Sequence, residues 1–420
     1  MPLAQDPDAN KPRGLILLGL TVLTKERNAL SLRWIPALLL CMLVGCTTTR
    51  MPYTAMDAER AEIPGYSHVR FIFDDLQPPE LARFRPSARN TPIRYLTISG
   101  GGAGGAFSVG VLNAWTETGR RPMFDIVSGV STGAIIAPFA FLGPDYDDEL
   151  RQLYTSGIAN QLVEQRFILS GLFGESLLKQ DPLRRLVERY VTGELLQAVA
   201  AEYRKGRNLF VSTTNLDSQR TVVWDLGAIA ASGQPDALTL FRSILIASAS
   251  IPGVYPAVGI ATTINGKPVT ELHSDGGPSA QILSLPDVIM TRMGTLFPAM
   301  AGKVEIYVLV NNTLGPEFQL TKSATFPVAM RAYATLVKSQ TKSSIMALYQ
   351  FSRRFGFQMK VAAINVSVPY SYSKPFSTQY MRAVYRNGYD RMKCQKLWSS
   401  TPEFDVVRNE AFSLGACASH

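Results

Sequence analysis

The stretch IRYLTISGGGAGGAF, residues 93–107, decides how this 420-residue chain folds. Its first seven residues are rich in apolar and β-branched side chains, as in a buried strand, and the run stops at a cluster of glycines. An apolar helical pattern follows at 106–119, and residues 124–129 predict a second buried strand. A strand, a glycine loop, a helix and another strand predict a mainly parallel sheet with helices on its faces. The fold class is therefore α/β.

The rest of the chain continues this alternation. Helical patterns lie at 145–205 and 237–248, and apolar strands at 208–215, 220–226 and 303–312. The C-terminal part predicts a long helix near 325–352, a strand near 359–367 and a helix near 376–393. We expect a main domain at 91–312 and a mixed α/β extension at 313–420 that packs on its core.

Residues 129–133, GVSTG, place Ser131 directly after the second strand. A G-x-S-x-G turn between a strand and a helix is typical of a nucleophilic serine. The turn is tight, which accounts for Gly129 and Gly133, and the following helix N-terminus favours negative charge near Ser131. An ordinary strand-to-helix turn can match the same five residues, so the motif alone leaves both interpretations open.

The glycine cluster supports two mechanisms. Gly100, Gly102 and Gly105 match the dinucleotide pattern G-x-G-x-x-G after a strand. The ribose-binding acid of that motif should end the second strand, whereas Asp125 begins it, which disfavours a dinucleotide. In the other interpretation, consecutive glycines let backbone N–H groups converge on a reacting carbonyl oxygen and form an oxyanion hole.

A third element is ELHSDGGPSAQ, residues 271–281, in which Asp275 precedes Gly276 and Gly277. Alone it fits an ordinary β-turn. Together with the segment IASASIPGVYPAV at 246–258, however, the motifs follow one another as in the patatin-like phospholipase family. The chain resembles this family over roughly residues 93–312.

The resemblance implies a patatin-like α/β fold, with 91–312 as the catalytic domain, and a Ser–Asp dyad in which Ser131 is the nucleophile and Asp275 its partner. It also implies an oxyanion loop made by Gly100, Gly101 and Gly102. The further motif glycines are Gly105, Gly129, Gly133, Gly276 and Gly277. One position departs from the family, which commonly has Lys or Arg where this chain has Gly104; the change removes a positive charge but no backbone donor.

Histidine is the usual proton acceptor for a serine, and the chain has three histidines. His68 lies in the N-terminal arm and His420 is the last residue. His273 lies two residues before Asp275, so both side chains point to the same side of a strand. A Ser131–His273–Asp275 triad would require the acid to reach around its own strand, so the dyad is favoured.

The N-terminal region indicates export. RWIPALLLCMLVGC, residues 33–46, has an apolar run too short for a transmembrane helix and typical of a signal peptide. Residues 43–46 resemble a bacterial lipobox. The resemblance implies that residues 1–45 are removed and that Cys46 is lipidated. The protein would then be lipid-anchored in the bacterial cell envelope, at the outer membrane if the source is a diderm. A buried helix with an ordinary cysteine is the alternative. The region before this run is unusually long for a signal peptide and contains a second apolar patch at 14–23. A start codon placed too far upstream would explain both features.

Residues 46–90 are rich in proline and charge and are expected to form a tether and an arm over the surface, with regular structure beginning at 93. After export only Cys394 and Cys417 would remain free, and an oxidising compartment would allow them to pair. The sequence does not fix the distance between them.

The composition is that of a globular protein, with 46% hydrophobic and 18% charged residues. The net charge of +9 becomes +7 without residues 1–45, which hold five basic and three acidic residues. This surplus suits anionic lipid headgroups. The chain has no dense Lys/Arg run and no nucleic-acid motif, so nucleic acid is not expected as a partner. No oligomeric state is predicted.

These features predict a lipid acyl hydrolase that cleaves carboxylic esters through an acyl-enzyme. Phospholipid is the favoured substrate because an anchored enzyme meets it in the membrane, with neutral lipids and thioesters as alternatives. No cofactor or metal is expected, since no cluster of His, Cys and carboxylates has ligand spacing. The competing hypothesis is a catalytically silent lipoprotein that binds lipid or a partner on the same fold. Intact Ser131 and Asp275 argue against it, and Gly104 favours it.

Overall fold

The computed structural model describes residues 50–76, 92–162, 178–296, 302–371 and 374–404. These described residues all belong to one compact unit. The expected signal peptide, Cys46 and Cys417 lie outside the described residues, so the predictions made for them stay predictions. Cys394 is disulfide-bonded.

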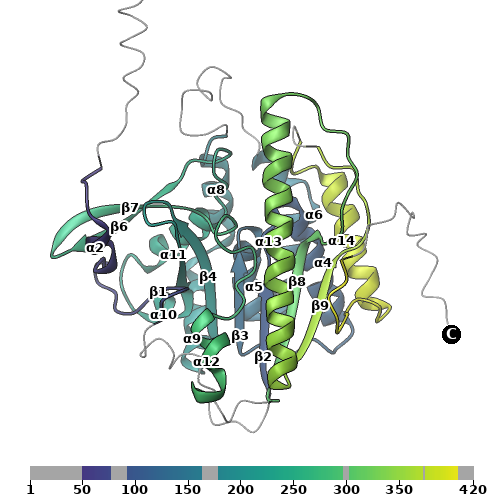
Figure 1. The fold of residues 1–420 in the computed structure, drawn as a ribbon, viewed down its shortest axis with the longest axis horizontal. Helices are drawn as coiled ribbons and strands as arrows, with labels where there is room; N and C mark the ends of the chain where they lie inside the picture. The colour runs from purple at the N-terminus through teal and green to yellow at the C-terminus, as the bar shows by residue number, and fades with distance from the viewer. Residues whose placement is uncertain (1–49, 77–91, 163–177, 297–301, 372–373, 405–420) are drawn as a thin grey trace, which may run out of the picture. The chain divides into compact units, whose positions relative to one another are not determined.

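Within the described residues, nine strands form one sheet, whose main path has the order β1-β5-β4-β3-β2-β8-β9 (Figure 1). Neighbours along β4-β3-β2-β8-β9 run parallel, and β5 and β1 continue the sheet antiparallel. The α/β fold with a mainly parallel sheet is therefore confirmed. The strands of the main path are β1 (Arg70–Ile72), β2 (Ile93–Ile98), β3 (Ile126–Val130), β4 (Asn208–Asn215), β5 (Arg220–Asp225), β8 (Val304–Thr313) and β9 (Gln358–Ile364).

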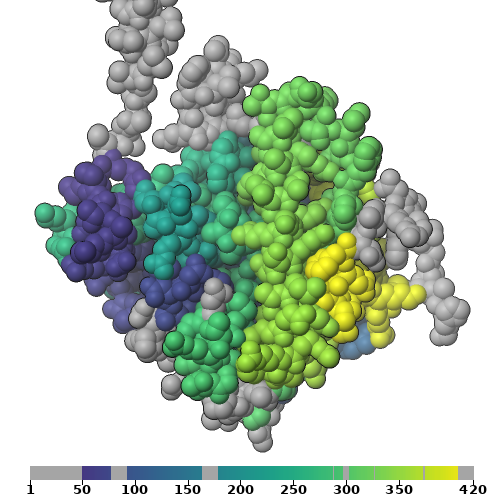
Figure 2. Space-filling view, in the orientation of Figure 1, coloured from purple at the N-terminus to yellow at the C-terminus, as the bar shows by residue number. Residues whose placement is uncertain are grey.

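Helices cover both faces of the sheet. Alternate residues of β8 enter different cores: Tyr307 and Leu309 pack with α4 and α14, whereas Ile306 and Val308 pack with α12 and α13. Figures 1 and 2 show α13, in green, running across the front. The long helices are α4 (Gly105–Glu117), α5 (Thr132–Leu142), α6 (Asp147–Thr155), α8 (Asp181–Tyr190), α9 (Gly193–Arg204), α11 (Ala237–Ser248), α12 (Asp287–Leu296), α13 (Thr325–Phe355) and α14 (Thr378–Lys393), and the short ones α2 (Ala55–Glu59) and α10 (Leu226–Ala231). None of the described helices combines the length and apolarity needed to cross a membrane.

The N-terminal arm departs from expectation, because regular structure begins before residue 93. Strand β1 pairs with β5 at the sheet edge. Val69, Phe71 and Phe73 are buried at every second position, which is the pattern of a strand with one covered face. The sequence analysis missed this strand because three residues are too short to establish a period.

A second unexpected feature is the hairpin of β6 (Val258–Ile264) and β7 (Lys267–Asp275), which joins the sheet through β4. Its two-residue turn, Asn265-Gly266, has φ angles of 50° and 76°. Asn-Gly is the preferred sequence for such a hairpin turn, so the signal was present in the sequence. The hairpin carries Asp275 back to the sheet, opposite Thr213 of β4.

Residues 313–404 contribute a strand to the same sheet. Strand β9 extends the sheet beside β8, and α14 packs along α4. Gly110 permits that contact, since a Cβ there would lie 2.1 Å from the Tyr385 carbonyl oxygen. The C-terminal part therefore stands beside the strands that hold the candidate site.

Candidate active site

Ser131 lies at a strained turn between β3 and α5. Its backbone has φ 56° and ψ −122°, a region that residues other than glycine rarely adopt. A Cβ at Gly129 would lie 2.2 Å from the Gly133 carbonyl oxygen, and one at Gly133 would lie 2.3 Å from that of Ile98. The turn therefore requires glycine on both sides of the serine, and its strain is of the kind that gathers at functional sites.

Asp275, 144 residues further along the chain, meets Ser131 at this turn. The Ser131 hydroxyl donates to Asp275 Oδ2 at 2.5 Å, and the Gly277 N–H donates to Oδ1 at 2.7 Å. Both side chains are buried. Burial raises the pKa of Asp275 to about 7, against the opposing effect of the hydrogen bonds from Ser131 and Gly277. A carboxylate with this pKa is matched to proton transfer near neutral pH.

The segment 246–258 fixes the backbones of both residues. Ser248 Oγ accepts the Ser131 N–H at 3.1 Å and donates to the Ser212 carbonyl at 2.7 Å. The Ser250 carbonyl accepts the Asp275 N–H at 2.9 Å. The sequence marked this segment only through its resemblance to the family, and these roles follow from the fold.

The three glycines of the expected oxyanion loop differ in what their N–H groups do. The Gly100 N–H already donates to the Gln281 carbonyl at 3.1 Å, so Gly100 holds the loop in place. Within the described part of the chain, the N–H groups of Gly101 and Gly102 have no hydrogen-bond acceptor. Gly101 and Gly102 have φ angles of 150° and 54°, conformations that favour glycine. Of the three loop glycines, Gly101 and Gly102 therefore have N–H groups available to stabilise the negative charge that develops on a reacting carbonyl oxygen.

Asn311, at the end of β8, explains the departure at Gly104. A Cβ at Gly104 would lie 2.0 Å from the Asn311 carbonyl oxygen, so the position has no room for a Lys or Arg stem. The side chain of Asn311 donates to the Ser99 carbonyl at 2.8 Å and accepts from the Ser108 hydroxyl at 2.6 Å. The glycine loop is therefore packed against β8 and cannot shift to admit a side chain.

The remaining motif glycines lie where the site's segments touch one another. A Cβ at any of them would come within 3 Å of a neighbouring atom: of Thr132 at Gly105, of Ser212 at Gly276, and of Gln281 at Gly277. Because these glycines have no side chain, the segments that carry them pack closely around the dyad.

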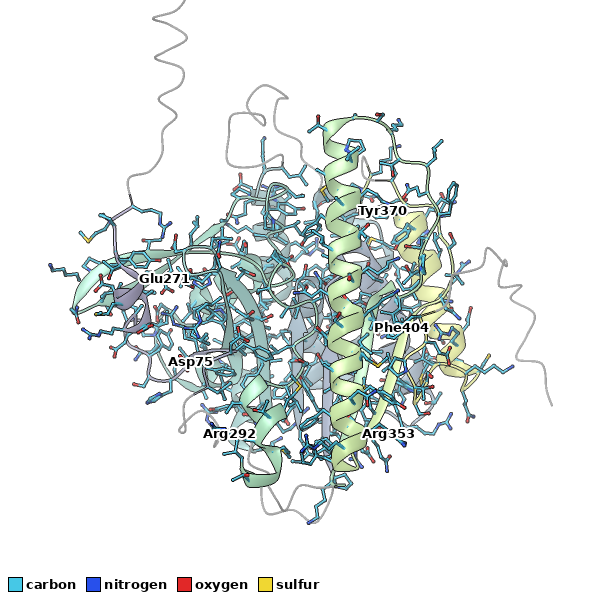
Figure 3. The ribbon with its side chains drawn as sticks, viewed as in Figure 1. Asp75, Glu271, Arg292, Arg353, Tyr370 and Phe404 are labelled. Atoms are coloured by element: carbon cyan, nitrogen blue, oxygen red, sulfur yellow. The ribbon has the colours of Figure 1, made fainter. Side chains whose placement is uncertain are left out.

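His273 is not joined to the dyad. Its ring nitrogens pair with Thr213 Oγ1 at 2.9 Å and Glu271 Oε2 at 3.2 Å, and Glu271 forms an ion pair with Arg70. Burial lowers the pKa of His273. Figure 3 shows Glu271 well separated from Tyr370, which lines the cavity beside Ser131. Among the described contacts, none links His273 to Ser131 or Asp275; His68 is exposed in the arm, and His420 lies outside the described residues.

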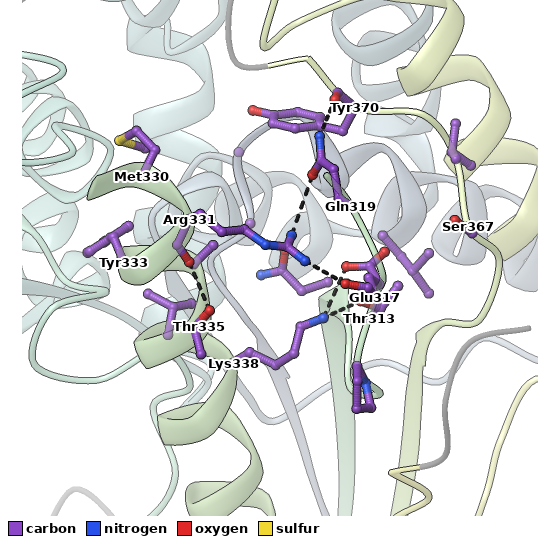
Figure 4. Close-up of a pocket in the computed structure, with 18 of the residues that line it drawn as sticks. Thr313, Glu317, Gln319, Met330, Arg331, Tyr333, Thr335, Lys338, Ser367 and Tyr370 are labelled. Atoms are coloured by element: carbon purple, nitrogen blue, oxygen red, sulfur yellow. Dashed lines mark hydrogen bonds and ion pairs between the residues drawn. The ribbon is translucent and has the colours of Figure 1, made fainter. Parts of the chain in front are cut away.

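A cavity of about 660 Å³ is lined at one end by the dyad, and Figure 4 shows residues of its other walls. Gly101, Gly102 and Gln281 line its inner end with the dyad, and most of its other walls come from residues 312–384. Its volume falls in the range of small-molecule sites. Tyr333 of α13 also lines it, and burial together with the Asp275 charge raises the pKa of Tyr333.

Gln281 is a further polar group at the inner end. Its side chain is 4% exposed, and Oε1 has no hydrogen-bond partner among the described residues. A Cβ built on Gly100 would lie 2.6 Å from this oxygen and 3.2 Å from Ser131 Cβ, so the amide stands beside the nucleophile. A buried amide oxygen with an unmet hydrogen bond is suited to hold a reacting hydroxyl or water. Gln281 ends the 271–281 stretch that contains Asp275, but the sequence alone gave it no role.

No three His, Cys, Asp or Glu side chains in the described ranges are grouped so as to hold a metal ion.

Residues 96–284 match the model of a family described as patatin-like phospholipase. No curated protein shows significant similarity to the chain. Among solved structures, the chain is similar to VipD from Legionella pneumophila, with 12% identity, a TM-score of 0.34, and coverage of 72% of this chain and 66% of VipD.

It is also similar to a structure of SpcU in complex with ExoU from the type III secretion system of Pseudomonas aeruginosa. The identity is 15% and the TM-score 0.23, with coverage of 63% of this chain and 53% of the matched one. The chain thus matches between about half and two-thirds of the length of these proteins.

Proposed function

We propose that this chain, whose residues 96–284 match the patatin-like phospholipase model, cleaves carboxylic esters of phospholipids or related lipids with Ser131 and Asp275. The observation that carries the proposal is the 2.5 Å hydrogen bond from the Ser131 hydroxyl to a buried carboxylate. The family suggests lipid acyl hydrolysis in general, and this contact supplies a serine with an acceptor for its proton.

In the first half-reaction, Ser131 Oγ attacks the ester carbonyl carbon while its proton passes to Asp275 Oδ2. The N–H groups of Gly101 and Gly102, with that of Thr132 at the start of α5, stabilise the oxyanion. The C–O bond to the alcohol then breaks, and the alcohol leaves with the proton from Asp275. The acyl chain remains as an ester on Ser131.

In the second half-reaction, water attacks this ester and gives a proton to Asp275. The tetrahedral intermediate collapses to the free fatty acid, and the proton returns to Ser131. Gln281 Oε1, with its unmet hydrogen bond beside Ser131, is placed to orient that water.

A fluorophosphonate probe tests the activated serine, because it labels only a nucleophilic hydroxyl. We expect labelling of the wild-type protein and none of Ser131→Ala, together with fatty-acid release from phospholipid vesicles by the wild type alone. A folded wild-type protein that neither reacts with the probe nor releases fatty acid would favour the catalytically silent alternative, which the comparisons do not favour.

The proposal extends to the location of the enzyme. We propose that Cys46 is lipidated and anchors the protein in a bacterial cell envelope, because the residues before it resemble a lipobox. Cys46→Ser should move the protein from the detergent phase to the aqueous phase, or leave it unprocessed. Unchanged partitioning of a processed Cys46→Ser protein would contradict the anchor.

A further inference from the structure

The segment 314–324, which joins β8 to α13, carries two large apolar side chains in water. Phe318 is 97% exposed and Leu320 is 88% exposed, the highest values among the described large hydrophobic residues. A single exposed apolar residue needs no explanation. Here two exposed apolar side chains lie on one short segment, and Phe318 also lines the active-site cavity. We call Phe318 and Leu320 the apolar lip.

The lip is held in this orientation by the residues between and before its two side chains. Glu317 Oε2 accepts from Lys338 Nζ at 3.0 Å, and the Glu317 carbonyl accepts from Arg331. Gln319 reaches the Tyr370 carbonyl at 3.4 Å and Arg331 at 3.5 Å (Figure 4).

Glu317 and Gln319 hydrogen-bond to the rest of the protein, whereas the side chains of Phe318 and Leu320 lie in solvent. Lys322 lies two residues beyond Leu320 and is also exposed. The segment thus presents two apolar groups and one cation to solvent.

We propose that Phe318 and Leu320 insert into the surface of a lipid bilayer and place the mouth of the cavity against it. The proposal deepens the function proposed above and rests on a lipid being the substrate. An apolar acyl chain would then pass from the bilayer into the cavity without crossing water.

The chemistry of the lip favours a lipid surface over a protein partner. Two side chains provide far less area than the roughly 1,200 Å² of a stable protein interface. Aromatic and aliphatic side chains beside a basic residue are typical of segments that enter the headgroup region, where anionic lipids attract the cation. The net charge, +9 for the full chain and +7 without residues 1–45, acts in the same direction.

The first test measures insertion directly and does not depend on catalysis. Phe318→Trp in the full chain is mixed with vesicles of phosphatidylcholine and phosphatidylglycerol that carry brominated acyl chains, which quench a tryptophan inside the bilayer. Met123→Trp is the matched control: Met123 is 51% exposed and precedes β3, whose other end leads to Ser131, so it lies at the opposite edge of the sheet.

We expect quenching beyond that of the wild type for Phe318→Trp and none for Met123→Trp. Absence of extra quenching at position 318 would overturn the proposal even if the protein hydrolyses lipids. Quenching at 318 in a protein that hydrolyses no ester would leave the lip standing and remove the proposed function.

The second test measures the effect on turnover. Leu320→Asp should lower hydrolysis of vesicle phospholipid by about tenfold to a hundredfold, the range expected for burying one large apolar side chain. Its hydrolysis of a soluble short-chain ester should match the wild type, because Leu320 lies outside the cavity lining. Met123→Asp should change neither rate. An equal loss on both substrates, or no loss on vesicles, would contradict insertion of Leu320.

Discussion

The two ends of the cavity are built in different ways. At the inner end, Ser131 and Asp275 are buried, and their positions follow from backbone turns and glycines that admit no side chain. At the outer end, Arg331 donates to the backbone carbonyl of Glu317 and Lys338 pairs with its carboxylate, and these side chains are partly exposed to water. We therefore expect the inner end to be rigid and to tolerate few substitutions. Substitutions at the outer end should leave the chemistry at the dyad unchanged.

This difference predicts that substitutions at the inner end abolish turnover and those at the outer end alter substrate use. The family model agrees in extent, since it stops at residue 284, before most of the outer wall begins.

The largest effect is expected at the dyad. Asp275→Asn should lower kcat by about 10⁴-fold or more, nearly as much as Ser131→Ala, because an amide cannot accept the serine proton. The measurement is steady-state hydrolysis of a soluble ester by folded variants.

His273→Ala is the control for the dyad. It should keep most of its activity and lose about 1–3 kcal/mol of stability, since Thr213 and Glu271 lose a buried partner. An inactive but folded His273→Ala protein, beside an Asp275→Asn protein with substantial activity, would make histidine the base.

The next effect concerns the glycine loop, where two adjacent positions form a matched pair. A Cβ at Gly101 would lie 2.4 Å from the Asn311 carbonyl oxygen, whereas at Gly102 no atom lies within 4 Å. Gly101→Ala should therefore displace an oxyanion donor and cost about 10²–10³-fold in kcat. Gly102→Ala, which meets only the strain of its positive φ, should cost clearly less. Equal, small effects would place the oxyanion hole elsewhere.

A third effect follows from the pKa of Asp275, which burial raises to about 7. Because the reaction needs the ionised carboxylate, kcat/KM should fall about tenfold per pH unit below that value, with the same limb in His273→Ala. Stability should change in the opposite sense. The raised pKa favours the folded state below the unfolded value near 4, and this contribution is lost as pH rises toward 7.

The two trends make the dyad a site where activity and stability oppose each other. Asp275→Asn removes the buried charge and should raise the unfolding free energy at pH 8 by about 2–4 kcal/mol, measured by denaturant titration. A flat pH profile of kcat/KM between 5 and 8, with no stabilisation in the variant, would show that Asp275 ionises at an ordinary pKa.

The sequence indicated the turn at Ser131 through its flanking glycines, because so tight a turn admits no side chain there. The role of Asp275 came only from the resemblance to a family, since its own segment also fits an ordinary β-turn. The sequence did not reveal that the Gly100 N–H donates to the Gln281 carbonyl, because that hydrogen bond joins residues 181 positions apart. The outer end was not predictable. Glu317, Arg331 and Lys338 lie in segments without a motif, and only the fold brings them together. The strand β1 was missed because its apolar alternation is too short.

The smallest effect is expected at Lys338, which ties α13 to the segment that carries the lip. Its ammonium donates to Thr313 Oγ1 at 2.9 Å, the Gly315 carbonyl at 2.8 Å and Glu317 at 3.0 Å. Such a partly exposed ion pair contributes up to about 1 kcal/mol, which corresponds to about fivefold. Lys338→Met keeps the apolar stem and removes these bonds, so the segment loses its anchor while the dyad is untouched.

We therefore expect KM for vesicle phospholipid to rise by up to about fivefold with kcat nearly unchanged, and a soluble ester to be hydrolysed as by the wild type. Raised salt should reduce the difference between wild type and variant, since screening weakens the same ion pair in the wild type. A fall in kcat for the soluble ester would mean that the outer wall also positions the reacting atoms, and the division between the two ends of the cavity would not hold.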